Sequence, residues 1–380
     1  MTGPAPRAVD VAIIGAGIVG CAAALELARG GASVALFEAR AIGAGASGRN
    51  SGAVQHPFDE ALSALHRATL DGYRRLAAES PEVFTFPDSP AGLLLVTPEE
   101  DLAALESEHA AIAHLAPELE PQLLTPAEVA RLEPSLAPDV SAIRLATGYP
   151  IPPAAAVQAF ADLAERQGAR FHLGEGAVLE RQEGRVISVR LGDGRVQAAG
   201  SVLVAAGPWS PEVIDPGGRW RPIERTWGVT VAVQLARPPR HVLEQVGVTS
   251  INRPEPADGI ASTFSLITAG ATSVVGSTFM AQEPDPGSVA PLLLDRGGRF
   301  VPGLRTVGVD EVRVCARPQS RDGRPLVGHV PGQDSLFIAA GHGPWGISTG
   351  PATARLVADL ILGRPVTIPA EIDPGRFGGP

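Results

Sequence analysis

The first hydrophobic run of the chain has the pattern of a buried parallel strand. Val9–Ile14 is almost continuously apolar and ends in glycines, as in a strand that is covered on both faces. A helix is predicted over Ile18–Arg29, closed by Gly30-Gly31, and a second apolar strand over Ser33–Phe37. This strand–helix–strand unit of about thirty residues has the size of a nucleotide-binding βαβ motif.

The next part of the chain contains two helix-start signals. Thr97-Pro98-Glu99-Glu100 and Thr125-Pro126-Ala127-Glu128 both read as capping boxes with proline at the first helical position. Prolines are frequent between residues 79 and 153, which indicates an inserted segment packed on a main domain. The helices predicted from these signals are Pro98–Leu115 and Pro126–Leu132.

After residue 150 the pattern changes to one helix and several short strands. An alanine-rich amphipathic helix is predicted over Pro152–Gln167 and stopped by Gly168. Gly192-Asp193-Gly194 is typical of a hairpin turn. The strands predicted around it are Arg170–Leu173, Ala177–Arg181, Val186–Leu191 and Ser201–Ala205.

The last third of the chain begins with β-branched runs and returns to alternating strand and helix. The runs predict an antiparallel sheet, and the C-terminal pattern again resembles an α/β domain. The predicted strands are Val229–Leu235, Ile260–Ile267, Thr272–Phe279, Val312–Ala316 and Leu336–Ala340, and the predicted final helix is Gly346–Leu362.

Length and composition favour a globular chain with two intertwined domains. The chain has 380 residues, of which 44% are hydrophobic, without an apolar run long enough for a membrane span. The net charge of −10 and the lack of a basic cluster argue against nucleic-acid binding. Cys21 and Cys315 form no metal or disulfide motif, so we expect no metal site. The polar N-terminal lead resembles no signal segment, so we expect a cytoplasmic protein.

One compositional feature limits the chemistry. All 31 basic residues other than histidine are arginines, and the sequence contains no lysine. Codon bias is the simplest explanation. The absence nevertheless excludes a lysine Schiff base, a phosphate-loop lysine and a lysine proton donor.

A glycine motif lies between the first predicted strand and helix. The three glycines of GxGxxG allow a tight turn, close approach of a pyrophosphate, and packing of the helix on the strand. Glu38 ends the second predicted strand, where a carboxylate can accept both ribose hydroxyls. An ordinary glycine turn is the alternative. The motif residues are Gly15, Ala16, Gly17, Ile18, Val19 and Gly20.

Two further segments of small residues favour close contact with a nucleotide. The loop 43–52 brings backbone N–H and hydroxyl groups near a ligand, unless it is a flexible surface loop. The second segment is the turn of residues 206–210, which follows the strand Ser201–Ala205 and permits close passage over a nucleotide. Arg40 either covers an adenine or is a solvated charge, and Trp209 is either a ligand contact or a core residue. The expected contacts here are Ala39, Arg40, Ser47, Arg49, Asn50, Ser51, Gly52, Val178, Ala206, Gly207 and Trp209.

The C-terminal segment supplies a third glycine-rich turn. The strand Leu336–Ala340 leads into this turn, which opens the final helix, so N–H groups and the helix dipole create positive potential there. The expected ligand contacts are Gly341, His342, Gly343, Trp345, Gly346, Ile347 and Ser348.

Together these segments resemble the glycine oxidase, D-amino acid oxidase and sarcosine oxidase family. The resemblance spans nearly the whole chain: GAGIVG with Glu38, GASGRNSG, AAGPWS, and RP…DGRPLVG…LFIAAGHGPWGISTGPATARLVADLI. It implies FAD as cofactor, hydride transfer from the carbon next to an amine nitrogen to flavin N5, and hydrolysis of the imine. An anionic reduced flavin would be stabilised by the C-terminal turn.

The resemblance also implies roles for single residues. Arg317 of the Arg-Pro pair corresponds to the arginine that holds the substrate carboxylate, and His342 is a candidate catalytic residue on the flavin face. The family's second substrate arginine falls on Pro344, and the only tyrosines, Tyr73 and Tyr149, lie outside the usual substrate strands. Cys315 is either a covalent flavin attachment point, as in sarcosine oxidase-like members, or a buried cysteine; non-covalent FAD is expected.

The expected fold is a Rossmann-type α/β FAD-binding domain interleaved with a smaller substrate domain on an antiparallel or mixed sheet. Residues 1–82, 150–215 and 310–380 would form the FAD domain, and 83–149 and 216–309 the substrate domain. A flavin monooxygenase and a non-catalytic flavoprotein subunit remain alternatives. The substrate would be a small amine or amino acid, and the acceptor oxygen, a quinone or another compound; an oligomer is left open.

Overall fold

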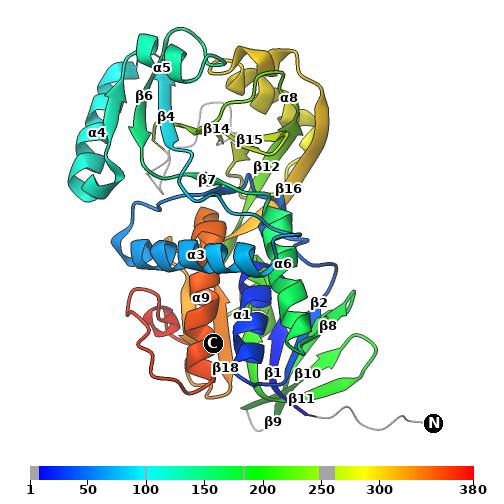
Figure 1. Ribbon diagram of the computed structural model, residues 1–380. Helices are drawn as coiled ribbons and strands as arrows, with labels where there is room; N and C mark the ends of the chain where they lie inside the picture. The colour runs from blue at the N-terminus through cyan, green and yellow to red at the C-terminus, as the bar shows by residue number, and fades with distance from the viewer. Residues whose placement is uncertain (1–7, 99–100, 183–184, 248–261) are drawn as a thin grey trace.

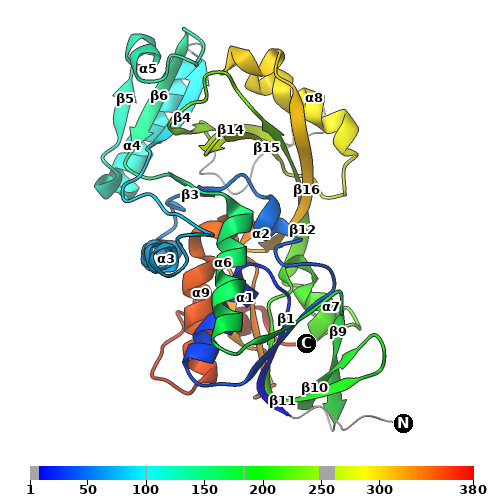
Figure 2. The ribbon, with the colours of Figure 1, turned by 45° about the vertical axis from the view of Figure 1, so that its right-hand side comes forward.

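The protein is built on two large β-sheets that lie one above the other in Figures 1 and 2. The computed structural model describes residues 8–98, 101–182, 185–247 and 262–380. Within these residues there are two eight-stranded sheets and one pair of short strands, β3 (Ala53–Val54) and β7 (Tyr149–Pro150). No helix of this part of the chain is long and apolar enough to cross a membrane.

The first sheet holds the predicted βαβ unit and is mostly parallel. Its central strand β1 lies between β2 and β11, and β8 and β18 continue the parallel pairing outward. β17 is an antiparallel edge, and β9 and β10 form an antiparallel extension of β11. The strands are β1 (Val9–Ile14), β2 (Val34–Glu38), β8 (Arg170–Leu173), β9 (Ala177–Gln182), β10 (Arg185–Leu191), β11 (Val196–Val204), β17 (Leu326–His329) and β18 (Leu336–Ala340).

Helices cover one face of this sheet (Figure 1). α1 (Ile18–Arg29), α6 (Pro153–Arg166) and α9 (Gly346–Ile361) lie along it, while α3 (Glu60–Glu79) crosses between the two sheets. Leu25 and Leu27 of α1 join Ile13, Leu36 and Leu203 of the strands in one buried cluster. The continuous apolar strands that the sequence shows are therefore buried on this side by helices.

The second sheet is antiparallel apart from one parallel pair, β13–β4. Val229, Val231 and Val233 of one strand pack with residues of α8 (Pro286–Gly297) in the core on one face. Because side chains alternate along a strand, the residues between these valines point to the other face. The order is β16 (Val309–Ser320), β12 (Ile223–Val233), β15 (Thr272–Thr278), β14 (Ser262–Ala269), β13 (Val242–Gln245), β4 (Leu93–Pro98), β6 (Val140–Leu145) and β5 (Gln122–Leu124).

Short helices complete the described fold. α4 (Leu102–Leu115) and α5 (Pro126–Leu132) lie at the outer end of the second sheet, beside β4 and β6 (Figure 2). The remaining α-helices are α2 (Ala46–Arg49) and α7 (Ser210–Ile214). The 3₁₀ turns are Pro117–Leu119, Gly207–Trp209, Pro302–Arg305, Gly343–Trp345 and Pro374–Phe377.

The structure confirms most predicted elements and corrects one. The helix expected from Pro98 is wrong at its start, because Thr97 and Pro98 are the last residues of β4 and pair with Ser141 and Val140. The helix begins at Leu102, and Glu99 and Glu100 lie outside the described residues. The second capping box is confirmed: Glu128 accepts hydrogen bonds from the Thr125 N–H and hydroxyl at 2.9 and 2.7 Å.

Several strand limits also differ from expectation. β11, β12 and β16 extend beyond the predicted runs because their outer residues pair with neighbouring strands, whatever their polarity. The first two residues of the run predicted at Ile260–Ile267 lie outside the described residues, and β14 starts at Ser262. The division into five domain segments stays a prediction; its boundary at residue 310 falls within β16, which belongs to the second sheet.

Candidate active site

A cavity of about 1340 Å³ lies where the carboxyl ends of the parallel strands meet one face of the second sheet. Ile14, Glu38 and Ala340 line it at the ends of β1, β2 and β18. Thr230 and Arg317 line it from the second sheet. In parallel α/β sheets this edge is the usual binding site, at the point where strand order reverses. The cavity exceeds the volumes of about 300–1000 Å³ common for drug-sized ligands.

The glycine motif forms the turn at this reversal point. Gly15 has a φ of +111°, and a Cβ there would lie 2.5 Å from the Ala205 carbonyl oxygen. A side chain at Gly20 would clash with the Gly15 carbonyl. Two of the three glycines are therefore required by backbone packing alone. Gly17 differs, because a Cβ built on it would meet only the Ser47 side chain.

Glu38 ends β2 beside this turn. One carboxylate oxygen accepts a hydrogen bond from the Ala16 N–H at 3.0 Å, and the other accepts from the Arg40 N–H at 2.9 Å. The side chain is half-buried and lines the cavity. These backbone donors fix a carboxylate at the place where the sequence predicts ribose binding.

The small-residue loop is tied to the glycine motif by two hydrogen bonds. The Gly43 N–H donates to the Ala16 carbonyl at 2.9 Å, and the Ile18 N–H donates to the Ser47 hydroxyl at 3.0 Å. Arg49, at the end of α2, donates to the Val314 carbonyl at 3.1 Å. The loop is thus hydrogen-bonded into the wall of the cavity and connects the first sheet to β16.

The C-terminal turn delivers the start of α9 to the cavity. Gly343 has a φ of +53°, and no side chain caps the N-terminus of α9. His342 is buried, and its Nε2 lies 3.1 Å from the Thr353 hydroxyl. Burial lowers the pKa of His342 to about 4, so the imidazole is neutral near pH 7. A neutral ring that lies in the turn before α9 and is hydrogen-bonded to Thr353 of that helix is poorly placed to act as a proton donor.

Arg317 projects from β16 over the second sheet. Its guanidinium donates to the Thr278 carbonyl at 2.8 Å and to the Ser277 hydroxyl at 2.9 Å, and lies 4.5 Å from the centre of the Phe279 ring. No carboxylate of the described residues forms an ion pair with it. Burial lowers its pKa, but an arginine stays protonated in proteins. A fixed positive charge with unused donors therefore faces the cavity.

Cys315 lies two residues before Arg317, on the same face of β16. It is buried, has no disulfide partner among the described residues, and lines the cavity. Burial raises the pKa of its thiol. The position is compatible with either sequence-based interpretation of this residue.

Most predicted site residues lie together in the cavity wall, and five do not. Gly20 lies in α1 and packs against the Gly15 carbonyl, Gly341 lies in a turn, Gly52 packs against the Ile151 carbonyl, and Val178 is 49% exposed. The Ser348 hydroxyl binds the Gln55 backbone at 3.1 Å. The wall contains the predicted Gly15, Ala16, Gly17, Ile18, Val19, Glu38, Ala39, Arg40, Ser47, Arg49, Asn50, Ser51, Ala206, Gly207, Trp209, Arg317, His342, Gly343, Trp345, Gly346 and Ile347.

Most polar side chains that line the cavity opposite the first sheet could not be recognised in the sequence. Gln55 and Glu244 are buried in the cavity wall, with the amide nitrogen of Gln55 donating to Glu244 at 2.9 Å. The alternation of residues along β12 could have revealed some of them. Val229, Val231 and Val233 are apolar and face the core, so Thr230 between them must point to the opposite face, which lines the cavity. Besides Arg317, the polar residues that the second sheet contributes to the wall are Glu224, Arg225, Thr226, Thr230, Glu244, Thr263, Ser265, Ser277 and Gln319, and Gln55 joins them from the segment between β3 and α3.

Comparisons with known proteins agree with this arrangement. Residues 10–360 match the model of the family described as "DAO: FAD dependent oxidoreductase". A glycine oxidase of Pseudomonas aeruginosa is 31% identical over 97% of this chain and 99% of its own length.

Two solved structures are similar to the whole fold. A glycine oxidase from Geobacillus kaustophilus has a TM-score of 0.84 and 23% identity, over 98% of this chain and 100% of its own. An iminodiacetate oxidase from Chelativorans has a TM-score of 0.78 and 24% identity, over 96% of this chain and 98% of its own. At these identities the likeness shows the fold.

Proposed function

Because this chain belongs to the family of FAD-dependent oxidoreductases, we propose that it oxidises the carbon next to the amine nitrogen of an amino acid whose carboxylate binds Arg317. The chain is an FAD-dependent enzyme, and relatives are named glycine oxidase and iminodiacetate oxidase. The observation that carries the choice of substrate is the guanidinium of Arg317, directed into the cavity without an acidic partner among the described residues.

The residues present fit FAD. Gly17 has no side chain to cap α1, and within the described chain the Ser47 hydroxyl accepts only from the Ile18 N–H, so the positive end of α1 still faces the cavity where a pyrophosphate could bind. Glu38 is positioned to accept the ribose hydroxyls, and the uncapped start of α9 supplies the positive end of a second helix dipole. The predicted cofactor contacts in the cavity wall are proposed on this basis.

Arg317 would hold and orient the substrate. A guanidinium has five N–H donors in a planar fork, and Thr278 and Ser277 accept one hydrogen bond each. The remaining donors can bind both oxygens of a carboxylate, which a lysine cannot do with the same geometry. Those two contacts fix the fork, so the substrate meets a preorganised site.

The polar wall favours a substrate with several hydrogen-bonding groups over a simple alkylamine. Thr230, Glu244 and Ser265 share the face of the second sheet that carries Arg317. An amino acid can exchange hydrogen bonds with this polar face, whereas an alkyl chain offers it no donor or acceptor. We therefore propose an amino acid or an N-substituted amino acid as the substrate class.

Bound FAD supplies the hydride acceptor, and water hydrolyses the imine that forms. The protein's own contribution is alignment of the substrate, which can account for about 7–11 kcal/mol of a barrier. His342 is neutral and bonded to Thr353, so we assign it to the shape of the cofactor turn. The proposed mechanism needs no charged histidine.

The test is anaerobic reduction of the holoenzyme, followed by loss of flavin absorbance. Amino acids, N-methylamino acids and matched amines without a carboxylate are compared. Bleaching only by compounds with a carboxylate supports the proposal. Bleaching by NADPH without an amine would instead indicate a monooxygenase, and no bleaching by any amine a non-catalytic subunit.

A variant pair tests the role of Arg317. Arg317→Lys should lower kcat/KM for an amino acid about 10- to 150-fold, as expected for loss of a charged, bidentate contact. Arg195→Lys is the matched control, because Arg195 lies in an exposed hairpin and its guanidinium binds the carboxylates of Asp193 and Glu175. Unchanged kinetics in Arg317→Lys would mean that no substrate carboxylate binds there.

Two further proposals concern the setting of the reaction. The electron acceptor is a quinone or another compound rather than oxygen, because the chain has no lysine, the compact cation that would favour electron transfer to oxygen beside a flavin. We propose a cytoplasmic location, where the two buried free cysteines, Cys21 and Cys315, would stay reduced. Size-exclusion chromatography with light scattering would establish the oligomeric state.

A further inference from the structure

The helix α9, which starts at the cavity, lacks one backbone hydrogen bond about one turn after its start. Pro351 lies within α9 (Gly346–Ile361). In a regular helix the N–H of residue 351 would donate to the Ile347 carbonyl, but proline has no N–H. Ile347 lines the cavity and is buried, so its carbonyl needs another donor.

Tyr73 of α3 supplies this donor. Its hydroxyl donates to the Ile347 carbonyl at 2.8 Å, and its side chain is fully buried. Burial raises the pKa of Tyr73 well above its ordinary value, so the hydroxyl keeps its proton. The hydrogen bond that Pro351 removes from α9 is therefore replaced from a different helix.

Two neighbouring residues of α3 extend the same contact. His66 Nδ1 lies 3.3 Å from the Ser348 carbonyl, and the Thr69 hydroxyl accepts a hydrogen bond from the Ala352 N–H at 3.2 Å. Burial lowers the pKa of His66 to about 4. Because the neutral ring faces a carbonyl, its proton lies on Nδ1. Residues 66, 69 and 73 share one face of α3, so a single helix face holds the backbone groups of Ile347, Ser348 and Ala352 in α9.

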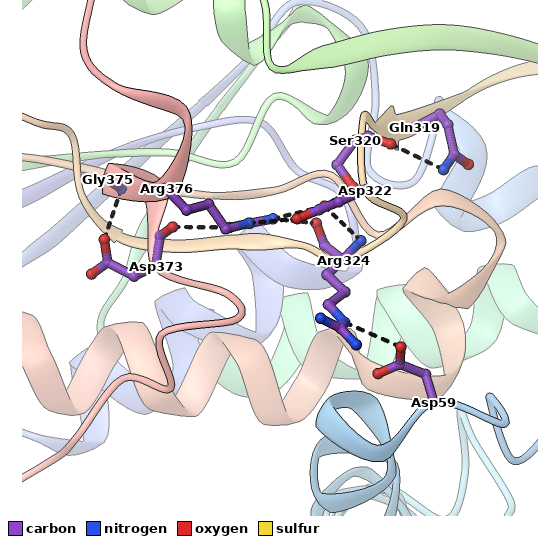
Figure 3. A network of polar contacts seen from close by, with 8 residues as sticks. All are labelled: Asp59, Gln319, Ser320, Asp322, Arg324, Asp373, Gly375 and Arg376. Atoms are coloured by element: carbon purple, nitrogen blue, oxygen red, sulfur yellow. Dashed lines mark hydrogen bonds and ion pairs between the residues drawn. The ribbon is translucent and has the colours of Figure 1, made fainter.

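The start of α3 is bound to the Asp-Gly-Arg-Pro turn (residues 322–325) by a network of polar contacts, drawn in Figure 3. Asp59 caps α3 by accepting from the Leu62 N–H at 3.1 Å, and it also accepts from Arg324 Nε at 3.1 Å. Asp322 accepts from the Arg324 N–H at 3.1 Å, and Arg376 binds the Asp322 carboxylate at 2.7 and 3.0 Å. This polar network connects the start of α3 to the 3₁₀ turn Pro374–Phe377.

We propose that Tyr73 is a positioning residue for the flavin site, because its hydroxyl replaces the helical N–H that Pro351 lacks. It keeps Gly346–Ser348, the first turn of α9, in the geometry that binds the cofactor; His66 supports the next carbonyl. The inference rests on FAD binding by this turn, and it does not depend on which substrate is oxidised.

A double-mutant cycle on the holoenzyme tests the replacement. Tyr73→Phe removes the hydroxyl that donates to the Ile347 carbonyl, and Pro351→Ala restores the helical N–H that can donate to the same carbonyl. In the double variant this restored backbone N–H is the donor in place of the tyrosine hydroxyl. Readouts are the FAD dissociation constant and the midpoint potential and visible spectrum of the bound flavin, all measured without substrate. Tyr149→Phe is the matched control, because the Tyr149 hydroxyl has no hydrogen bond among the described residues.

We expect Tyr73→Phe to weaken FAD binding about tenfold, equivalent to about 1.4 kcal/mol, and to shift the flavin potential and spectrum. Pro351→Ala should bind FAD like the unaltered protein, and the double variant should recover most of the loss. Equal losses in Tyr73→Phe and in the double variant would overturn the proposal, as would an unchanged Tyr73→Phe holoenzyme.

Folding failure is also informative in this design. If Tyr73→Phe does not fold, recovery of a yellow, folded double variant supports the replacement, and failure of the double variant contradicts it. A wild-type protein that takes up no FAD would refute the proposed function instead. A yellow protein that no amine reduces would leave this cycle measurable, so the two failures are distinguishable.

Discussion

Gly228 of β12 lies directly against the guanidinium of Arg317. A Cβ built on Gly228 would be 2.5 Å from both terminal nitrogens of Arg317. The two residues lie on adjacent antiparallel strands, two positions apart in register. The missing side chain therefore creates the space in which the charged group extends toward Thr278 and Ser277.

Gly228→Ala should displace Arg317 and reduce kcat/KM for an amino acid about 10- to 150-fold, as for a lost charged hydrogen bond. The clash involves the flexible end of a side chain, so FAD content should stay unchanged. Steady-state kinetics with flavin quantification checks this result. Gly308→Ala, where a Cβ would meet nothing within 4 Å, should behave like the unaltered enzyme; full activity of Gly228→Ala would contradict the assignment.

Gly17→Val should abolish FAD binding. Its Cβ would lie 3.0 Å from the Ser47 hydroxyl, which accepts from the Ile18 N–H, and the branched side chain would occupy the space needed by a pyrophosphate. Flavin absorbance of the purified variant gives the answer. Gly192→Val is the control at an open turn, and a fully yellow Gly17→Val protein would refute the phosphate site.

Acid denaturation should release FAD into solution, because Cys315 is expected to be a buried thiol rather than an attachment point. Burial raises its pKa, which disfavours the reactive thiolate. The supernatant and the precipitate are compared after acid treatment. Yellow colour that remains with the protein and disappears in Cys315→Ala would show a covalent link.

Folding stability should fall as the pH decreases from about 6.5 to about 4. The pKa values of His66 and His342 are lowered to about 4 by burial, from the 6.5 of an unburied histidine. In this window the unfolded chain binds more protons, so acid favours unfolding by about 2 kcal/mol per histidine between pH 7.5 and 5.

Urea unfolding at pH 7.5 and pH 5 with saturating FAD measures this dependence. His342→Asn should reduce the pH dependence, while His114→Gln, at an exposed position, should retain it. Equal stability of the unaltered protein at the two pH values would mean that these histidines are protonated in the folded state.

The reduced enzyme should react more slowly with oxygen than with a quinone or dye. A nearby fixed cation favours electron transfer to oxygen, since superoxide is an anion. Arg49 lines the cavity, but its guanidinium is bound to the Val314 carbonyl, and its planar fork differs from a compact ammonium. Stopped-flow reoxidation compares the acceptors, and oxygen reacting fastest would identify an oxidase.

The sequence predicted the first sheet better than the second. Apolar strands such as Val9–Ile14 and the glycine that starts each turn are local signals, and α1 begins and ends as expected. The helix expected at Pro98 failed because pairing with Val140, far along the chain, keeps Thr97 and Pro98 in a strand. A local capping pattern cannot reveal that competition.

Site prediction followed the same division. Glycine-rich turns and Glu38 could be found because their spacing is fixed by a local motif. Glu244 could not, since it reaches the cavity only when β13 pairs with β14 and β4. α3 was also missed, although Asp59 is a good N-cap, and with it the contact between Tyr73 and Ile347.

The pairing of β11 has a consequence for how the chain matures. β11 pairs with β1 through Val204 and Ile14, and with β18 through Val204 and Ile338, so both partners are more than a hundred residues distant. During synthesis β1 cannot form its parallel pairing with β11 until residues 196–204 have been made. The other edge of β11 then stays unpaired until β18 has been synthesised. Unpaired edges promote aggregation, and such distant contacts slow folding. A chain interrupted before Leu336 should therefore aggregate rather than accumulate as a partial enzyme.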